Sequence, residues 1–252
     1  KLYFGDTITS ILLDTTLLYK DPFDPSGDLG LFSIDNNIIY RAVVPSGFFS
    51  ENRNYVLTIK NLDSGIEVFS TTEIINDFSF RDFNPSYKIG FYNPSASPVD
   101  SLKFTSKTIK WNTSNNGSIY QLDLVFNYIE NDALKSLVWS QREVEYDGIN
   151  MQTRLEGKGF FNFLTQNLIS NNELERNFVS VDLVMTVGTE DLNTYIKINQ
   201  PINTVSQQRP QFTNIENGIG IFSSRYTHVE RNIGLTQNTL DYLINGLDLN
   251  FQ

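Results

Sequence analysis

Cysteine is absent from this chain of 252 residues, and histidine occurs once, as His228. Without cysteine there are no disulfide bonds, thiolate metal ligands or cysteine nucleophiles. A hydrolase triad would have to use His228 as its base, and the sequence has no Gly-x-Ser-x-Gly elbow to carry a nucleophilic serine. We therefore expect a protein that is not an enzyme and takes no cofactor, with His228 in a structural or surface position.

Positive charge and long apolar segments are also scarce. The chain has 19 Lys and Arg against 29 Asp and Glu, which gives a formal net charge of −10, and no two basic residues are adjacent. Binding to nucleic-acid phosphates therefore lacks its electrostatic footprint. No segment approaches the roughly 18 apolar residues that span a bilayer. We expect no nucleic-acid partner and no membrane-spanning helix.

Aromatic residues are abundant, with 19 Phe and 12 Tyr. They favour strands, because flat rings pack well on a pleated surface, and the sequence predicts a mainly β fold. Turn signals divide it into an N-terminal β-sandwich over residues 1–82 and a larger antiparallel β-rich domain over 88–252. In the first domain we expect residues 38–44, 55–60 and 66–71 to follow one another as antiparallel neighbours.

The second domain shows the clearest periodicity. Residues 119–130 alternate strictly, which predicts a central strand that forms a long hairpin with the run to Tyr146. Another strand is expected over 178–187. The residues that we place on the core faces of these two strands are Tyr120, Leu122, Leu124, Phe126 and Tyr128, and Val179, Val181, Leu183, Met185 and Val187.

Two short helices interrupt the strands. Apolar residues recur at helical spacing over 159–169 and again over 237–246, where Thr236 is placed to cap the helix. The segment 190–196 fits a helical turn or the start of a strand. Asn217-Gly218 predicts a type I′ turn, which needs a positive φ at both residues, and a strand is expected to follow it.

Three groups of residues are candidates for a site. Asp21, Asp24 and Asp28 lie in one loop and could hold a calcium ion, although their spacing is not that of an EF-hand and an ordinary loop is the alternative. Glu143 and Glu145 share a strand face about 7 Å apart, which allows a glycosidase pair; solvated charge is the alternative. Trp111, Trp139 and tyrosines could stack on sugar rings or lie in the core.

The segment Arg209-Pro-Gln-Phe-Thr-Asn-Ile-Glu-Asn-Gly-Ile-Gly-Ile-Phe-Ser-Ser-Arg225 resembles the C-terminal signature of Bacteroidota outer-membrane lipoproteins of unknown function, often encoded beside TonB-dependent transporters. Residues 55–65 with 70–74 resemble their immunoglobulin-like or transthyretin-like N-terminal unit, and 109–111 with 120–130 resemble the strands that follow. The resemblance implies a lipidated cysteine upstream of Lys1 and a cell-surface location, with the periplasmic face as the alternative, and it supplies no established catalytic residues to carry over.

Exported proteins of this phylum carry O-glycans at Asp-Ser/Thr-apolar or Asp-Ser/Thr-Thr triplets, so the resemblance makes Thr7, Thr15 and Ser101 candidate glycosylation sites. We expect the chain to act as an accessory or binding subunit of an outer-membrane β-barrel complex for transport or secretion. The loops at 21–28 and 93–98 are the expected docking surface, because loops vary while the sheets hold them in place. The alternatives are a carbohydrate-binding or carbohydrate-active surface protein and a structural adhesin.

Overall fold

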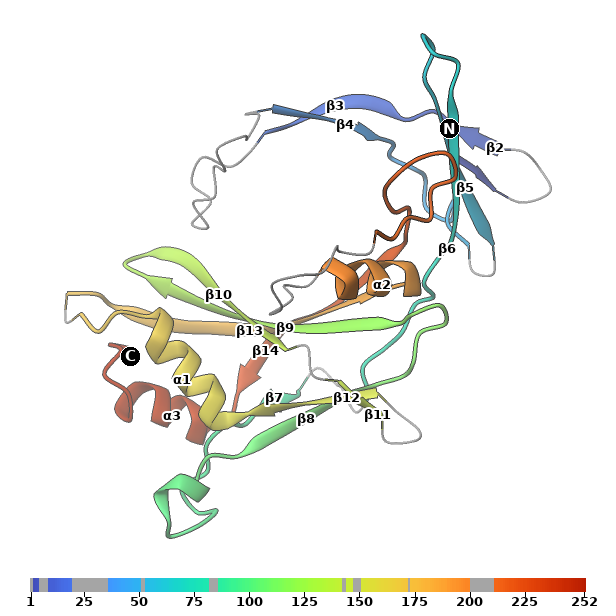
Figure 1. Cartoon of the computed structure of the whole chain (residues 1–252). Helices are drawn as coiled ribbons and strands as arrows, with labels where there is room; N and C mark the ends of the chain where they lie inside the picture. Colours follow the sequence, from blue (N-terminus) through green and yellow to red (C-terminus); the bar gives the residue numbers. More distant parts are fainter. Residues whose placement is uncertain are drawn as a thin grey trace, which may run out of the picture. The chain divides into compact units, whose positions relative to one another are not determined.

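The computed structural model describes residues 2–4, 9–19, 36–50, 53–81, 86–141, 144–146, 151–171, 173–199 and 211–252. The fold is mainly β: strands take up 45% and helices 16% of the described residues, in several antiparallel sheets and three short α-helices (Figure 1). The fold class expected from the sequence is confirmed.

The chain forms two compact units, Lys1–Ile74 with Thr194–Ser224 and Ile75–Asn193 with Arg225–Gln252. The first unit therefore takes in a segment that we had assigned to the second domain. Two backbone hydrogen bonds tie that segment to the first unit, since Phe69 and Glu216 each donate to the other's carbonyl oxygen, at 3.4 and 2.8 Å. A pairing over such a separation leaves no periodic signal in the sequence.

The described strands of the first unit are β1 (Leu2–Phe4), β2 (Thr9–Ile11), β3 (Asp14–Tyr19), β4 (Asn36–Arg41), β5 (Asn54–Lys60) and β6 (Glu67–Glu73). Four of them form an antiparallel sheet in the order β2-β1-β5-β6, and β3 pairs with β4 in a separate ribbon. The hairpin of β5 and β6 is confirmed, with Gly65 at φ +72° in its turn.

The expected pairing of 38–44 with 55–60 is wrong. β4 pairs with β3, and β5 pairs with β1 and β6. Within this unit Phe48 and Tyr55 are the buried hydrophobic residues among those described. The Tyr55 hydroxyl accepts a hydrogen bond from the backbone nitrogen of Ser50 at 2.7 Å, so this ring anchors the loop before β5. The immunoglobulin-like or transthyretin-like character of the unit stays a prediction.

The described strands of the second unit are β7 (Lys88–Ile89), β8 (Ser106–Trp111), β9 (Ile119–Glu130), β10 (Ala133–Gln141), β11 (Glu145–Tyr146), β12 (Met151–Glu156), β13 (Arg176–Gly188) and β14 (Arg225–Leu235). A five-stranded sheet has the order β10-β9-β13-β14-β7, and a three-stranded sheet has the order β11-β12-β8. All pairs are antiparallel except β14 with β7. The helices are α1 (Gly157–Asn167), α2 (Glu190–Asn199), α3 (Gln237–Asn245) and the short 3-10 helix η1 (Asp100–Leu102).

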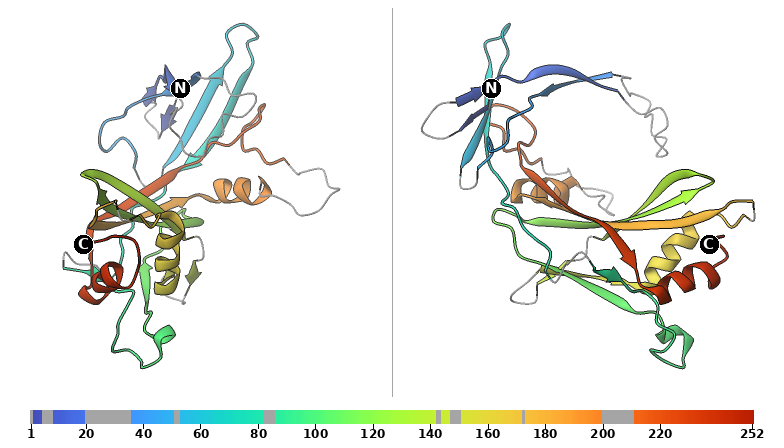
Figure 2. Two further views of the ribbon diagram at one scale, coloured as in Figure 1. Left: turned by 90° about the vertical axis from the view of Figure 1, so that its left-hand side faces the viewer. Right: turned by 180° about the vertical axis from the view of Figure 1, so that it is seen from behind.

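The core of this unit lies on one face of the five-stranded sheet. Helices α1 and α3 lie side by side on that face, together with the three-stranded sheet (Figures 1 and 2). The predicted central strand is confirmed, since β9 alternates between buried and half-buried residues along its whole length and pairs with β10 and β13. The hairpin ends at Gln141, because β11 pairs with β12 instead.

The prediction for Val179 is wrong, although Val181, Leu183, Met185 and Val187 are buried as expected. The register between β13 and β9 shifts between Phe178 and Ser180. Such an irregularity turns the extra residue out of the alternation, and Val179 is 45% exposed.

Both predicted helices are confirmed as α1 and α3, and the ambiguous segment at 190–196 is helical. Thr236 is the N-cap of α3 with extended backbone, but its side chain makes no capping hydrogen bond to the helix backbone. Its Oγ1 lies 2.9 Å from Thr239 Oγ1, and Thr239 Oγ1 in turn accepts a hydrogen bond from the backbone of Phe91. This network joins α3 to the chain that follows β7.

The prediction of a type I′ turn with a following strand at Asn217-Gly218 is wrong. Asn217 has a positive φ of 59°, but Gly218 does not, and the next strand begins only at Arg225. Side chains hold the intervening segment: Asn214 Oδ1 accepts from Phe222 N and its Nδ2 donates to Phe222 O, both at 2.8 Å. An amide side chain thus takes the place of a strand partner.

Candidate functional site

Several residues that we proposed from the sequence cannot be placed. The following lie outside the described residues: Asp21, Asp24, Asp28, Thr7 and Glu143. Glu145 pairs with Gln152 in β11, but its side chain is also outside the description. Thr15 is exposed on β3, and Ser101 lies in η1. The metal, glycosidase and glycosylation hypotheses therefore stay predictions.

His228 is half-buried on β14 and packs against two neighbouring phenylalanines, whose ring centroids are 6.3 Å apart. Its ring centroid lies 5.5 Å from that of Phe78 and 5.5 Å from that of Phe80, and its Nε2 lies 3.1 Å from a carboxylate oxygen of Glu230. On the same strand, the Tyr226 hydroxyl donates to Asp77 Oδ1 at 2.6 Å, and this hydrogen bond raises the pKa of Tyr226 to about 12. These contacts fit the structural position that we expected for His228.

The two tryptophans belong to the core of the second unit. Trp111 is fully buried, so no sugar ring can stack on it. Trp139 is half-buried and its ring stacks on Phe163 with centroids 6.1 Å apart. The sugar-stacking hypothesis therefore fails for Trp111, whose ring packs inside the core against Tyr120 with centroids 5.8 Å apart.

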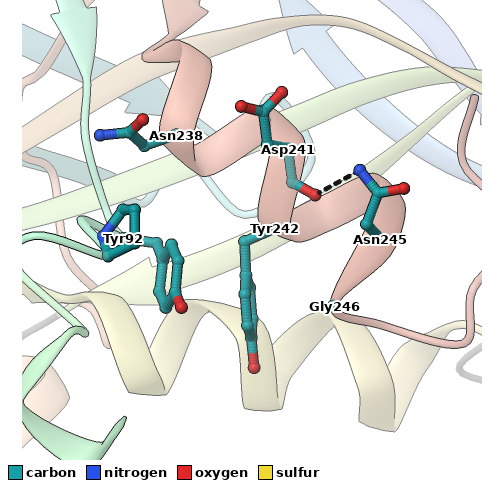
Figure 3. Close-up of a pocket in the computed structure, with 7 residues that line it drawn as sticks. Tyr92, Asn238, Asp241, Tyr242, Asn245 and Gly246 are labelled. Atoms are coloured by element: carbon teal, nitrogen blue, oxygen red, sulfur yellow. Dashed lines mark hydrogen bonds between the residues drawn. The ribbon is translucent and has the colours of Figure 1, made fainter. Parts of the chain in front are cut away.

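A pocket of about 360 Å³ opens beside α3 (Figure 3). It lies wholly within the second unit, between the chain after β7 and the C-terminal helix. The residues that line it are Tyr92, Pro94, Asn238, Asp241, Tyr242, Asn245 and Gly246. Pro94 belongs to the loop at 93–98 that we expected to dock a partner, so the pocket is built partly from that loop.

Two stacked tyrosines form the aromatic part of the pocket. The rings of Tyr92 and Tyr242 have centroids 4.2 Å apart and planes 24° apart (Figure 3). Tyr242 also packs edge-to-face on Phe161 at 4.8 Å and on Phe104 at 5.4 Å. Burial raises the pKa of the Tyr242 hydroxyl, so this group stays protonated at neutral pH and can donate a hydrogen bond.

Helix α3 contributes the polar part of the pocket. Asn238, Asp241 and Asn245 are three and four residues apart, so they follow one side of the helix, and all three line the pocket (Figure 3). Asp241 Oδ1 accepts from Gln237 Nε2 at 2.8 Å, and Asn245 Nδ2 donates to the Asp241 carbonyl oxygen at 3.1 Å. Leu243, on the opposite face, is fully buried.

Our reading of the sequence missed this pocket. The sequence did indicate the polar face of α3, because the residues between the apolar positions of the helix are polar. Tyr92 carried no such signal, because it reaches Tyr242 only through the tertiary fold. The loop at 93–98, which we had predicted as a docking surface, contributes one lining residue, Pro94.

The first unit carries a different surface feature on the ribbon of β3 and β4. Leu17 pairs with Ile38 and Thr15 pairs with Tyr40, so these four side chains share one face of the ribbon. Leu17, Ile38 and Tyr40 are 46%, 66% and 66% exposed. Among the described residues β3 and β4 pair only with each other, which leaves the outer edge of each strand unpaired there.

No family model, no curated protein and no solved structure matches the chain. Among the residues with a described structure, no three acidic or histidine side chains gather where they could hold a metal ion. The helices in those same parts of the chain are all too short or too polar to cross a bilayer.

Proposed function

We propose that this chain is the non-catalytic ectodomain of a lipid-anchored protein of the outer membrane, exposed at the cell surface. In this role it is an accessory or binding subunit that docks on an outer-membrane β-barrel protein for transport or secretion. The observation that carries the proposal is the exposed apolar face of the β3–β4 ribbon, formed by Leu17, Ile38 and Tyr40.

The ribbon is suited to a partner that also consists of strands. Large apolar side chains grouped on one exposed face are typical of protein–protein contacts. An unpaired strand edge offers a row of backbone donors and acceptors to which another strand can add. The two features occur together on β3 and β4, and a β-barrel protein presents strands and strand-connecting loops to its partners.

Anchoring strengthens such a contact without adding surface to it. A lipid anchor confines the ectodomain to the membrane in which the barrel resides, so the effective concentration of each partner is high and a modest interface suffices. The net charge of −10 works against adsorption to anionic lipid. A contact with a partner protein therefore explains how the ectodomain would be held at a defined position better than adsorption to the lipid surface does.

The test is co-purification of the full-length lipoprotein from detergent-solubilised outer membranes, compared with an abundant unrelated lipoprotein. A variant carrying Ile38→Lys and Tyr40→Ser should lose a barrel protein that the wild-type chain retains. Leu134→Lys is the matched control, because Leu134 is an equally exposed strand residue in the second unit. Recovery of no barrel protein above the unrelated lipoprotein, or equal recovery with all three chains, would defeat the proposal.

A further inference from the structure

We propose that the pocket beside α3 binds one ring of a neutral saccharide. This site is separate from the ribbon of the proposed function and uses none of its residues. Three features of the pocket carry the inference: a preformed aromatic surface, a face of amide and carboxylate side chains, and a lining without Lys, Arg or His.

The aromatic surface is held in place before any ligand arrives. Tyr242 contacts Tyr92, Phe104 and Phe161, and the backbone nitrogen of Tyr92 donates to Thr239 Oγ1 at 3.3 Å. Sugar rings have an apolar face of C–H groups that packs on aromatic side chains. Since the tyrosines need no rearrangement, binding would cost little ordering of side chains.

The polar face of α3 matches the hydroxyl groups on the rim of a sugar ring. An asparagine side chain both donates and accepts hydrogen bonds, and a carboxylate accepts them. Asn238 forms no side-chain hydrogen bond with another described residue, and the one described bond to the Asp241 carboxylate is the one from Gln237. Neighbouring hydroxyls also donate and accept, so Asn238, Asp241 and Asn245 offer complementary partners along one side of the pocket.

The lining also argues against other ligands. An anionic ligand would meet the Asp241 carboxylate with no cationic lining residue to offset it. An extended peptide takes most of its affinity from main-chain hydrogen bonds to a strand edge, whereas this pocket presents helix side chains. Its volume of about 360 Å³ lies at the small end of the range for ligand pockets, which suits one ring of a chain that continues into solvent.

The test is affinity electrophoresis of the full chain through native gels that contain a neutral glucan, mannan, xylan or galactan, with alginate as an acidic polysaccharide. At least one neutral polysaccharide should retard the chain, and oligosaccharides prepared from it should show saturation-transfer NMR signals. Asn238→Ala combined with Asn245→Ala should weaken binding at least tenfold. The melting temperature should stay unchanged, because both side chains are exposed.

The matched control is Asn167→Ala. Asn167 Nδ2 donates to the Phe163 carbonyl oxygen one turn back on α1 at 2.8 Å, the same arrangement as Asn245 with Asp241, but outside the pocket. If the double variant melts early, Asn238→Ala alone serves, since no described residue depends on that side chain. The inference is overturned if no neutral polysaccharide retards the chain, if alginate alone does, or if the pocket variants bind as tightly as Asn167→Ala.

Discussion

The guanidinium of Arg176 lies against the carboxylate of Glu130, with Nε and Nη2 both 2.8 Å from Oε2. The Arg176 side chain is 2% exposed, so this is a buried ion pair. Its Nη1 donates to the carbonyl oxygens of Ile169 and Leu249 at 3.1 and 2.7 Å. One side chain thus joins β9, the end of the α1 region and the C-terminal segment.

We expect Arg176→Met to lower the free energy of unfolding by about 3 kcal/mol or more, because it leaves a buried carboxylate short of a partner and two carbonyl groups without a donor. Arg154→Met is the control: Arg154 Nε lies 2.7 Å from Glu156 Oε1, but both side chains are exposed, and such pairs contribute about 1 kcal/mol at most. Denaturant titration of the two variants measures the difference. Equal losses would show that burial of Arg176 adds nothing.

Acid should destabilise the protein partly through Glu130. Hydrogen bonds from Lys135 and then Arg176 lower the pKa of Glu130 below its ordinary value of 4.5. A lowered folded-state pKa contributes stability that is present above the unfolded value and is lost as pH falls through the folded value. We expect the wild-type chain to lose more stability between pH 6 and pH 3 than Glu130→Gln does. Denaturant titration at each pH measures the free energy of unfolding of both chains. An equal loss of stability in the two chains would contradict this role of Glu130.

Gly218→Ala should destabilise the first unit by about 1 kcal/mol or more through overpacking. The reason is contact and not backbone strain, since a Cβ on Gly218 would lie 2.9 Å from Ile215 Cγ2 and 3.3 Å from Val68 Cγ1. Ile215→Ala should therefore restore part of the loss when combined with it. In Gly65→Ala, where φ is +72° and nothing lies within 4 Å of the added Cβ, only strain acts. Melting temperatures of the wild-type chain, Gly218→Ala, Gly218→Ala with Ile215→Ala, and Gly65→Ala separate the two causes. If Ile215→Ala restores none of the loss, the contact with Ile215 is not its cause.

The glycosylation prediction now bears on docking. Thr15 is exposed and lies opposite Tyr40 on the apolar face of the β3–β4 ribbon. A glycan on Thr15 would cover that face, so chains that carry one should not co-purify with a barrel partner. We expect protein from its native host to exceed the mass of its own unmodified polypeptide by whole glycan units, and partner-bound chains to carry their glycans at Thr7 or Ser101. Peptide mapping of the partner-bound and unbound fractions locates the glycans. A native mass equal to that of the unmodified polypeptide would contradict the glycosylation prediction.

Local periodicity carried the parts of the fold that the sequence predicted well. The alternation in β9 and the helical spacing in α1 and α3 record which side of each element faces apolar neighbours, and this property repeats every two or about 3.6 residues. The mainly β class followed from the same signals together with the aromatic content. Local periodicity does not show which strands pair with one another. β4 pairs with β3 and not with β5, because register and partner depend on the whole sheet.

By itself, the sequence determined the mainly β class, the central strand, two of the helices and the exclusion of cysteine chemistry, because each depends on composition or on neighbours along the chain. Only the tertiary structure decided the exposure of Val179, the conformation at Gly218 and the stack of Tyr92 on Tyr242. The candidate pocket belongs to this second group. Its two rings are far apart in the chain, and they meet because Thr239 Oγ1 binds the backbone of Phe91 and Tyr92 and so docks α3 beside them.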